Sequence, residues 1–173
     1  IIRQIQITPD STTIRLISCL QDTGATEKQL AVYVWALGFT KYRPAVPAII
    51  DLRRRNHAEL LQSNCLMALG SLGGNLAGEY LVGQLDSVSD EGEKYNIMNY
   101  LAQMHYENAL PKMAEILAVD PKEFYWKPIF VFGKMGDKAV PFLLEKINDK
   151  NKNVRANAIN ILGSWLIAPE AAI

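Results

Sequence analysis

The stretch ANAINILG at residues 156–163 is the last of five similar segments along the chain. The other four are AVYVWALG (31–38), SNCLMALG (63–70), YNIMNYLA (95–102) and WKPIFVFG (126–133). All five end on a small residue, with steps of 32, 32, 31 and 30 residues between Gly38, Gly70, Ala102, Gly133 and Gly163. A period of this length is typical of proteins in which short helical units stack in a row. The chain is therefore predicted to be a repeat protein.

Residues 137–166 give the clearest view of one repeat. Asp137 is placed to cap a helix whose first turn contains Pro141, where a missing N–H does little harm. The polar turn 148–153 separates this helix from a second one. Each unit is thus predicted to hold two helices, which we call A and B. Apolar spacing by three and four predicts these inward residues: Phe142, Leu143, Leu144 and Ile147 in A, and Val154, Ala158, Ile161, Leu162 and Trp165 in B.

The other units follow the same plan. Pro47 and Pro111 occupy the place of Pro141, and Glu79 takes that place in the third unit. No repeat contains a plausible strand, so the predicted fold class is all-α, an α-solenoid of about five antiparallel helix pairs. The first A helix is expected at about residues 11–22, with inward-facing Ile14, Ile17 and Leu20.

The predicted repeats make up one domain, 11–167, preceded by an N-terminal segment, 1–10. Pro169 follows Gly163 by six residues, as Pro44 follows Gly38, so residues 168–173 are expected to begin a further repeat or a cap. The expected repeat boundaries are about 11–38, 39–72, 73–104, 105–135 and 136–167.

Two local features of the B helices carry further expectations. The recurring glycines can serve as left-handed C-caps or allow close contact between helices, and Ala102, which takes the place of glycine in the third segment, favours close contact. Pro128 falls in the middle of the fourth B helix. A kink is expected there, because proline has no N–H to donate.

Composition argues against several classes of function. Lys and Arg number 18, as do Asp and Glu, so the chain lacks the excess of cations that nucleic-acid binding uses. No run of 18 apolar residues is present, so no membrane span is expected. Cys19 and Cys65 lie among apolar residues and are interpreted as core residues. Cysteines of this kind favour a reducing compartment, which predicts a cytoplasmic location.

The segment GKMGDKAVPFLLEKINDKNKNVRANAINILGSW (133–165) resembles the short HEAT-like repeat named after phycobilisome lyases. The matching elements are Gly136-Asp137, Ala139-Val140-Pro141, Asp149, Val154-Arg155 and Ile161-Leu162-Gly163. The resemblance implies a right-handed stack with the A helices on the convex side and the B helices on the concave side. It does not imply lyase activity, because function cannot be taken from the fold alone.

A row of B-helix positions lies away from the predicted buried side. In the last unit this row is 153, 157, 160 and 164, and in the family reading it faces the concave groove. The equivalent positions combine large apolar side chains with amides and lysines, as protein-recognition surfaces do. The candidate partner-binding residues are Trp35, Phe39, Asn64, Met67, Asn96, Asn99, Gln103, Lys127, Phe130, Lys134, Asn157 and Asn160.

The apolar members of this row have an alternative interpretation. Trp35, Phe39, Met67 and Phe130 can instead pack against adjacent repeats, a further N-terminal cap or another copy of the chain. Tyr95, Tyr125 and Trp126 lie closer to the edge of the row and are interpreted as structural.

No motif for catalysis is found. His57 and His105 occupy different places in the repeat, so no metal site or catalytic residue is predicted. The run Arg53-Arg54-Arg55 ends an A helix and is interpreted as interacting with the helix dipole and water, with an anion or phosphopeptide contact as the alternative. No Gly-Lys-Ser/Thr motif follows the glycines at 70, 73, 74 and 78, which are interpreted as helix ends and a loose turn.

The sequence therefore predicts a non-catalytic scaffold without a cofactor, which binds a protein or peptide on the concave side of the B helices. The alternative is a bilin lyase, or a chaperone-like component of one, that binds a tetrapyrrole. Nucleic-acid binding is a third possibility that the neutral charge disfavours. The oligomeric state is left open.

Overall fold

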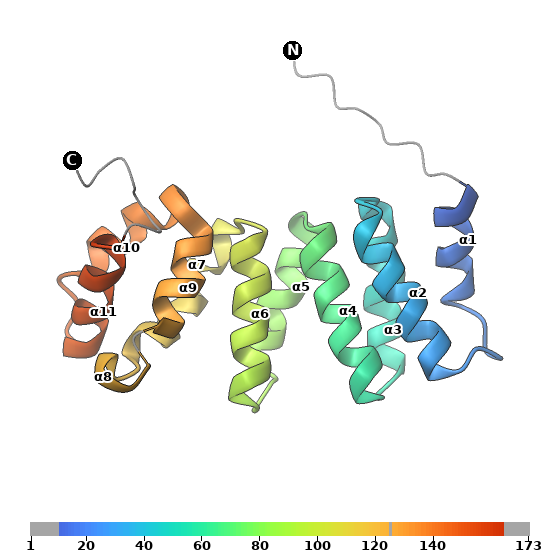
Figure 1. Ribbon diagram of the computed structural model, residues 1–173, viewed down its shortest axis with the longest axis horizontal. Helices are drawn as coiled ribbons and strands as arrows, with labels where there is room; N and C mark the ends of the chain where they lie inside the picture. Colours follow the sequence, from blue (N-terminus) through green and yellow to red (C-terminus); the bar gives the residue numbers. More distant parts are fainter. Residues whose placement is uncertain (1–10, 125, 165–173) are drawn as a thin grey trace, which may run out of the picture. The chain divides into compact units, whose positions relative to one another are not determined.

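The computed structural model describes residues 11–124 and 126–164 (Figure 1). Helices joined by turns make up these residues, and no strand lies among them. The all-α prediction is thus confirmed. Contacts divide the chain into two compact units, unit 1 (Ile1–Tyr80) and unit 2 (Leu81–Ile173). The boundary between them falls inside helix α5 (Asn75–Leu85), in the third predicted repeat.

Unit 1 is built around two long neighbouring helices, α2 and α4. Figure 1 shows them side by side, with α3 fainter behind them. Helix α3 packs on α4, and α1 packs on α2. Besides the start of α5, the unit contains α1 (Ser11–Cys19), α2 (Glu27–Phe39), the 3₁₀ turn η1 (Arg43–Ala45), α3 (Val46–Arg55) and α4 (Glu59–Leu72).

Local sequence explains how α2 begins and why it lies close to α4. Thr26 and Gln29 form a capping box: the Thr26 hydroxyl accepts a bond from the Gln29 backbone N–H at 3.3 Å, and the Gln29 side-chain Oε1 accepts one from the Thr26 backbone N–H at 2.9 Å. A Cβ at Gly38 would lie only 3.2 Å from the Ala68 Cα. Gly38 therefore permits close helix contact, which is one of the two explanations offered for the recurring glycines.

Unit 2 contains shorter elements. Helix α6 packs against α9, and α11 packs against α9, α10 and the 3₁₀ turn η3. Fully buried side chains such as Leu101, Met113 and Phe132 form its core. After the end of α5, its elements are α6 (Glu91–Gln103), η2 (Glu107–Ala109), α7 (Leu110–Met113), η3 (Ala114–Ala118), α8 (Pro121–Phe124), α9 (Trp126–Met135), η4 (Gly136–Ala139), α10 (Val140–Lys146) and α11 (Lys152–Leu162).

Three A helices begin in the same way. Each follows a 3₁₀ turn that ends on a fully buried alanine, and each has a proline in its first turn, as Pro47, Pro111 and Pro141 predict. Asp137 is not the cap of α10, because it lies within η4 and the N-cap residue is Ala139. The 3₁₀ turn leads directly into the helix and leaves no place for a side-chain cap.

The third A helix, α5, begins differently. It starts at Asn75 after Gly73 and Gly74, whose φ angles of 67° and 92° are left-handed, and Glu79 is its fifth residue. The expected loose turn is therefore confined to Gly73 and Gly74. Gly70 and Gly78 are buried within helices α4 and α5.

Several sequence expectations are wrong in detail. Ile14 and Leu144 are exposed, while Leu162 is half-buried. Ile14 is exposed because α1 packs through Thr13 and Leu20, the latter lying beyond the end of the helix at Cys19. Leu144 is exposed because α10 is short and fully buries only Leu143.

Some expectations fall outside the described residues. These concern the segments 1–10 and 168–173, the inward position of Trp165 and the structural interpretation of Tyr125. The kink expected at Pro128 depends on how α8 (Pro121–Phe124) and α9 (Trp126–Met135) are joined at Tyr125, which lies outside the described residues.

Candidate functional site

The candidate residues fall into groups that belong to different units. In unit 1, α2 carries Trp35 and Phe39, and α4 carries Asn64 and Met67. In unit 2, α6 carries Asn96, Asn99 and Gln103, α9 carries Lys127, Phe130 and Lys134, and α11 carries Asn157 and Asn160.

The unit 1 group is mostly apolar and exposed. Val32, Trp35 and Phe39 are spaced by three and four residues along α2, and their side chains are 59%, 49% and 66% exposed. The Trp35 and Phe39 ring centres are 4.8 Å apart in an edge-to-face arrangement. On the neighbouring α4, Leu60 is exposed and Met67 is half-buried. We call these five residues the α2–α4 surface.

Asn64 connects the two helices beneath this surface. Its side-chain amide donates to the Ala31 carbonyl of α2 at 3.2 Å. The bond shows that this part of α4 faces α2. Because the side-chain amide of Asn64 on α4 bonds to the backbone of α2, Asn64 helps to hold the two helices together.

The unit 2 group is built from α6 and α9. The Trp126 ring lies 5.8 Å from that of Tyr95 and 6.4 Å from that of Phe130, measured between ring centres. Trp126 and Phe130 are 41% and 52% exposed. We call the following residues the α6–α9 surface: Tyr95, Asn96, Asn99, Gln103, Trp126, Lys127, Phe130 and Lys134.

Both lysines of the α6–α9 surface contact α6. The Lys127 ammonium lies 5.8 Å from the centre of the Tyr95 ring, a cation–π distance. The Lys134 ammonium donates to the Asn99 side-chain oxygen at 2.9 Å, and the Asn99 amide donates to the Tyr95 carbonyl at 2.9 Å. The two charges are therefore positioned by groups on the neighbouring helix.

Asn157 does not join these exposed residues, contrary to the sequence prediction. Its side chain is only 1% exposed, and its amide donates to the Leu117 and Val119 carbonyls, both at 2.9 Å. Asn153 donates to the intervening Ala118 carbonyl at 3.1 Å. The carbonyls at the end of a helical turn lack partners within the helix. The side chains of these two asparagines donate the hydrogen bonds that these carbonyls accept. Asn160 is exposed on the same helix.

Sequence reasoning left three exposed side chains out of the candidate set. Val32 and Leu60 extend the rows of Trp35 and Met67 at helical spacing, so the spacing was a signal that could have included them. Trp126 was interpreted as structural, yet it is partly exposed and touches Phe130.

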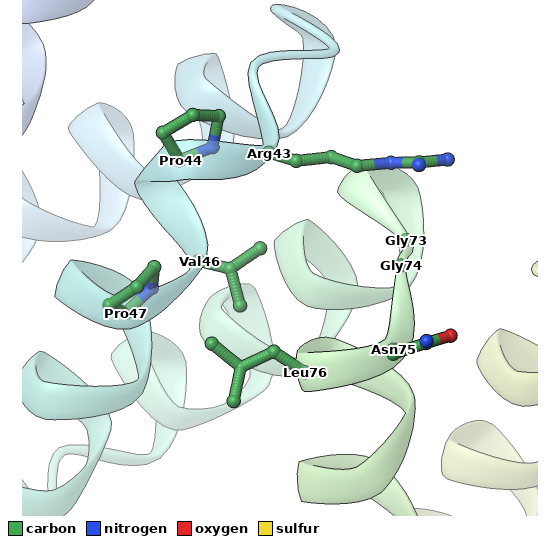
Figure 2. Close-up of a pocket in the computed structure, with 8 residues that line it drawn as sticks. All are labelled: Arg43, Pro44, Val46, Pro47, Gly73, Gly74, Asn75 and Leu76. Atoms are coloured by element: carbon green, nitrogen blue, oxygen red, sulfur yellow. The ribbon is translucent and has the colours of Figure 1, made fainter.

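A pocket of about 490 Å³ lies in unit 1 between the starts of α3 and α5 (Figure 2). The Arg43 Nε donates to the Leu72 carbonyl at 3.3 Å, and Gly74 leaves room for this side chain, since a Cβ there would lie 3.3 Å from the Arg43 Cδ. Arg43 is the only ionisable residue among those that line the pocket: Arg43, Pro44, Val46, Pro47, Gly73, Gly74, Asn75 and Leu76.

A smaller pocket of about 260 Å³ adjoins the α6–α9 surface in unit 2. Glu91 and Lys94, which both line it, form an ion pair at 3.1 Å. Tyr95 and Lys127 belong to both the pocket and the surface, and Glu115 of η3 also lines the pocket.

Among the ionisable groups of the described residues, the Cys65 thiol has a strongly shifted pKa. Burial raises the pKa of the Cys65 thiol to about 12, against a smaller opposing effect of the Arg53 charge. The thiol is therefore protonated at neutral pH and is a poor nucleophile. No group of three His, Cys, Asp or Glu residues within 11–124 and 126–164 is placed to hold a metal ion.

The arginine run at the end of α3 packs more closely than expected. Arg53 is buried, donates to the Tyr80 hydroxyl at 3.1 Å and lies 5.8 Å from the centre of its ring. Arg54 lies at the same distance from that ring, and Arg55 donates to the Leu20 carbonyl at 2.6 Å. The expectation of contact mainly with water and the helix dipole is thus wrong for Arg53.

Comparison with known proteins leaves the geometry as the main guide to function. No protein-family model matches the chain, and no curated protein matches its sequence. Among the described helices, none has the length and apolar character needed to cross a membrane.

Proposed function

We propose that the chain is a non-catalytic scaffold of HEAT-like repeats, an α-solenoid whose B helices (α2, α4, α6, α9 and α11) bind a protein or peptide. The observation that carries this proposal is the exposed apolar row Val32, Trp35 and Phe39 on α2. Single exposed apolar residues are common on proteins, but a contiguous row that includes tryptophan is typical of an interaction surface.

The α2 row is additional to the apolar face that folds the helix. Leu30, Val34 and Leu37 already fill the buried side of α2, so the core does not need Trp35 or Phe39. The outer row therefore exposes apolar surface at some cost in solubility and gives nothing to the core of unit 1. Partner binding gives these side chains a use.

The repeat pattern supports the scaffold part of the proposal. The sequence period of 30 to 32 residues coincides with a recurring local structure, in which a buried alanine and a proline begin three of the A helices. Units that bury their apolar faces only against neighbours form extended binding surfaces.

Peptide display followed by solution binding tests this function. The full chain is used to select peptides from a random library, and the enriched peptides are measured against Trp35→Ala, Phe130→Ala and Leu144→Ala. Leu144 is the control, because it is an exposed leucine of an A helix. We expect affinity to fall about 10-fold or more with Trp35→Ala or Phe130→Ala and to stay unchanged with Leu144→Ala. Failure to select any peptide, or equal binding by all three variants, would contradict the proposal.

A further inference from the structure

The pocket between the starts of α3 and α5 combines one cation with apolar walls. We call it the α3–α5 pocket, and all of its lining residues belong to unit 1. Val46, Pro47 and Leu76 contribute apolar side chains, and Arg43 contributes the charge (Figure 2). The volume of about 490 Å³ is typical of ligand sites, which are mostly apolar and have a few polar groups that fix the orientation of the ligand.

The Arg43 side chain is directed over the glycine turn that begins α5. Figure 2 shows it extending from η1 towards Gly73 and Gly74. A Cβ on Gly74 would lie 3.3 Å from the Cδ and 3.9 Å from the Cζ of Arg43, so glycine at this position leaves the room that the guanidinium group occupies. The Arg43 Nε donates to the Leu72 carbonyl at 3.3 Å, and this bond fixes the direction of the group.

The charge of Arg43 is not paired within the part of the chain that the structure describes. Its contact there is the Nε bond, and no carboxylate forms an ion pair with it. The acidic residues of the two helices lie in their second turns, where Asp51 pairs with Arg55 at 3.2 Å and Glu79 is outside the pocket lining. The two terminal nitrogens of Arg43 form a fork that matches the two oxygens of a carboxylate.

The equivalent junction of unit 2 has a different pair of side chains. Glu107 of η2 and Lys138 of η4 form an ion pair at 2.8 Å. Counted from the proline position of each A helix, Arg43 takes the place of Glu107, and Leu76 takes the place of Lys138. Two opposite charges thus meet in unit 2, whereas unit 1 has a cation and a leucine, which cannot form an ion pair. A ligand with a carboxylate and an apolar group is complementary to both.

We propose that the α3–α5 pocket binds a carboxylate that carries an apolar group, with the carboxylate on the Arg43 guanidinium group and the apolar group against Pro47 and Leu76. The pocket shares no residue with the α2–α4 surface, so it is a second binding site of unit 1. A free organic acid and the C-terminal residue of a partner chain share this chemistry, and the experiment distinguishes them.

NMR titration of the ¹⁵N-labelled full chain tests the proposal. The probes are N-acetyl-leucine and N-acetyl-leucinamide, which have the same side chain and differ in the carboxylate. We expect the acid to bind in the millimolar range, as a ligand of few atoms does, about fivefold or more tightly than the amide and more weakly at high salt. The backbone amides of Gly73, Gly74 and Asn75 should show the largest shift changes. N-acetylglycine, which has no apolar side chain, should bind about fivefold more weakly than N-acetyl-leucine.

Variants of the protein then locate the binding. Arg43→Gln should lower the affinity for the acid to about that for the amide, and Lys28→Gln, at an exposed cation outside the pocket lining, should not change it. Leu76→Glu adds a carboxylate to the pocket and should weaken binding of the acid about tenfold, while the neutral Leu76→Gln should weaken it about threefold. An acidic residue suits the first turn of a helix, so Leu76→Glu is expected to fold, and circular dichroism verifies each variant.

Two peptides distinguish the sources of the carboxylate. Both have the sequence Gly-Ser-Gly-Ser-Leu, one with a free C-terminus and one with an amidated C-terminus. If the free peptide binds about threefold or more tightly than N-acetyl-leucine, the pocket binds the end of a partner chain. If the two affinities are equal, the pocket binds a small acid. The amidated peptide should bind as weakly as N-acetyl-leucinamide in either case.

The outcomes separate this inference from the scaffold function. Equal binding of the acid and the amide, shift changes that avoid the glycine turn, or unchanged binding of the acid to Arg43→Gln and Leu76→Glu would overturn the pocket proposal. Peptides selected on the full chain test the scaffold function independently. If they depend on Trp35 and bind Arg43→Gln normally, the scaffold function stands whether or not the pocket binds a carboxylate.

Discussion

The α2–α4 surface of unit 1 and the α6–α9 surface of unit 2 occupy equivalent places in the repeat and carry different chemistry. Position 32 is Val where position 96 is Asn, and position 35 is Trp where position 99 is Asn. One buried position of the sequence period is apolar and fully buried in α2, α4, α6 and α9, where it is Leu37, Leu69, Leu101 and Phe132. We call these four residues the buried column. The comparison indicates that the buried column maintains the helix packing and leaves the outer rows free to differ.

The units also differ in how their helices are held together. In unit 1, α2 and α4 meet where Gly38 lies against Ala68, so small residues allow close packing. In unit 2, α11 is joined to the short η3 by the side-chain amides of Asn153 and Asn157. Short 3₁₀ segments leave more carbonyls without partners, and polar side chains from a neighbouring helix satisfy them.

The largest expected effect tests the distinction between buried column and outer row. Phe132 is fully buried and stacks on Phe142, whereas Phe130, two residues away, is half exposed. We expect Phe132→Ala to lower the free energy of unfolding by about 3–5 kcal/mol and Phe130→Ala by about 0.5 kcal/mol. Urea denaturation measures both. Similar losses for the two variants would show that Phe130 belongs to the core and would remove it from the proposed binding surface.

The sequence could predict this distinction for several residues but not for all. The repeat period and the spacing of apolar residues identified the helical class, the prolines at the starts of three A helices and the outward positions of Trp35, Phe39 and Phe130. These features depend on neighbours within one helix, which sequence spacing describes. Their role in binding stays a prediction.

Features that depend on distant segments were not predictable in this way. The burial of Asn157 depends on carbonyls 38 and 40 residues away in the sequence. The capping role expected of Asp137 failed because a 3₁₀ turn precedes α10. Leu162 is half-buried although its spacing places it inward, since periodicity gives a direction but not the neighbour that covers it.

The second prediction tests the polar contact in unit 2. Asn157→Ala removes two hydrogen bonds and leaves the Leu117 and Val119 carbonyls without this partner, so we expect a loss of about 1–3 kcal/mol. Asn64→Ala in unit 1 removes one bond at a half-buried site, and we expect about 1 kcal/mol or less. Thermal and urea unfolding of both variants give the comparison. A larger loss for Asn64→Ala would mean that amide bonds matter more to unit 1 than close packing does.

The third prediction concerns pH and the buried thiol of unit 1. Burial raises the pKa of Cys65 from 9.0 to about 12, so between these values the unfolded chain loses a proton that the folded chain retains. The stability from the protonated thiol is complete below pH 9 and is lost as the pH rises towards 12. At pH 10 the loss is on the order of 1 kcal/mol, because the pH is then one unit above the pKa of the unfolded thiol.

The free energy of unfolding, measured from pH 8 to pH 10.5, tests the slope of stability against pH that this loss predicts. Cys65→Ala should flatten it, while Tyr100→Phe tests the corresponding group of unit 2, since burial raises the pKa of the Tyr100 phenol as well. If Cys65→Ala keeps the full slope, another group is responsible for the loss of stability.

The smallest expected effect compares two helical glycines. Gly83, in the part of α5 that belongs to unit 2, has open space where a Cβ would lie, whereas a Cβ at Gly38 in unit 1 would meet the Ala68 Cα at 3.2 Å. Alanine stabilises a helix interior relative to glycine by about 0.5–1 kcal/mol. We expect Gly83→Ala to gain that amount, and Gly38→Ala to gain nothing or to destabilise, because a backbone atom cannot move aside as a flexible side chain can. Melting curves of the two variants decide the matter. An equal gain at both sites would mean that α2 and α4 can separate slightly without loss, and close packing would then not explain why unit 1 has glycine at this position.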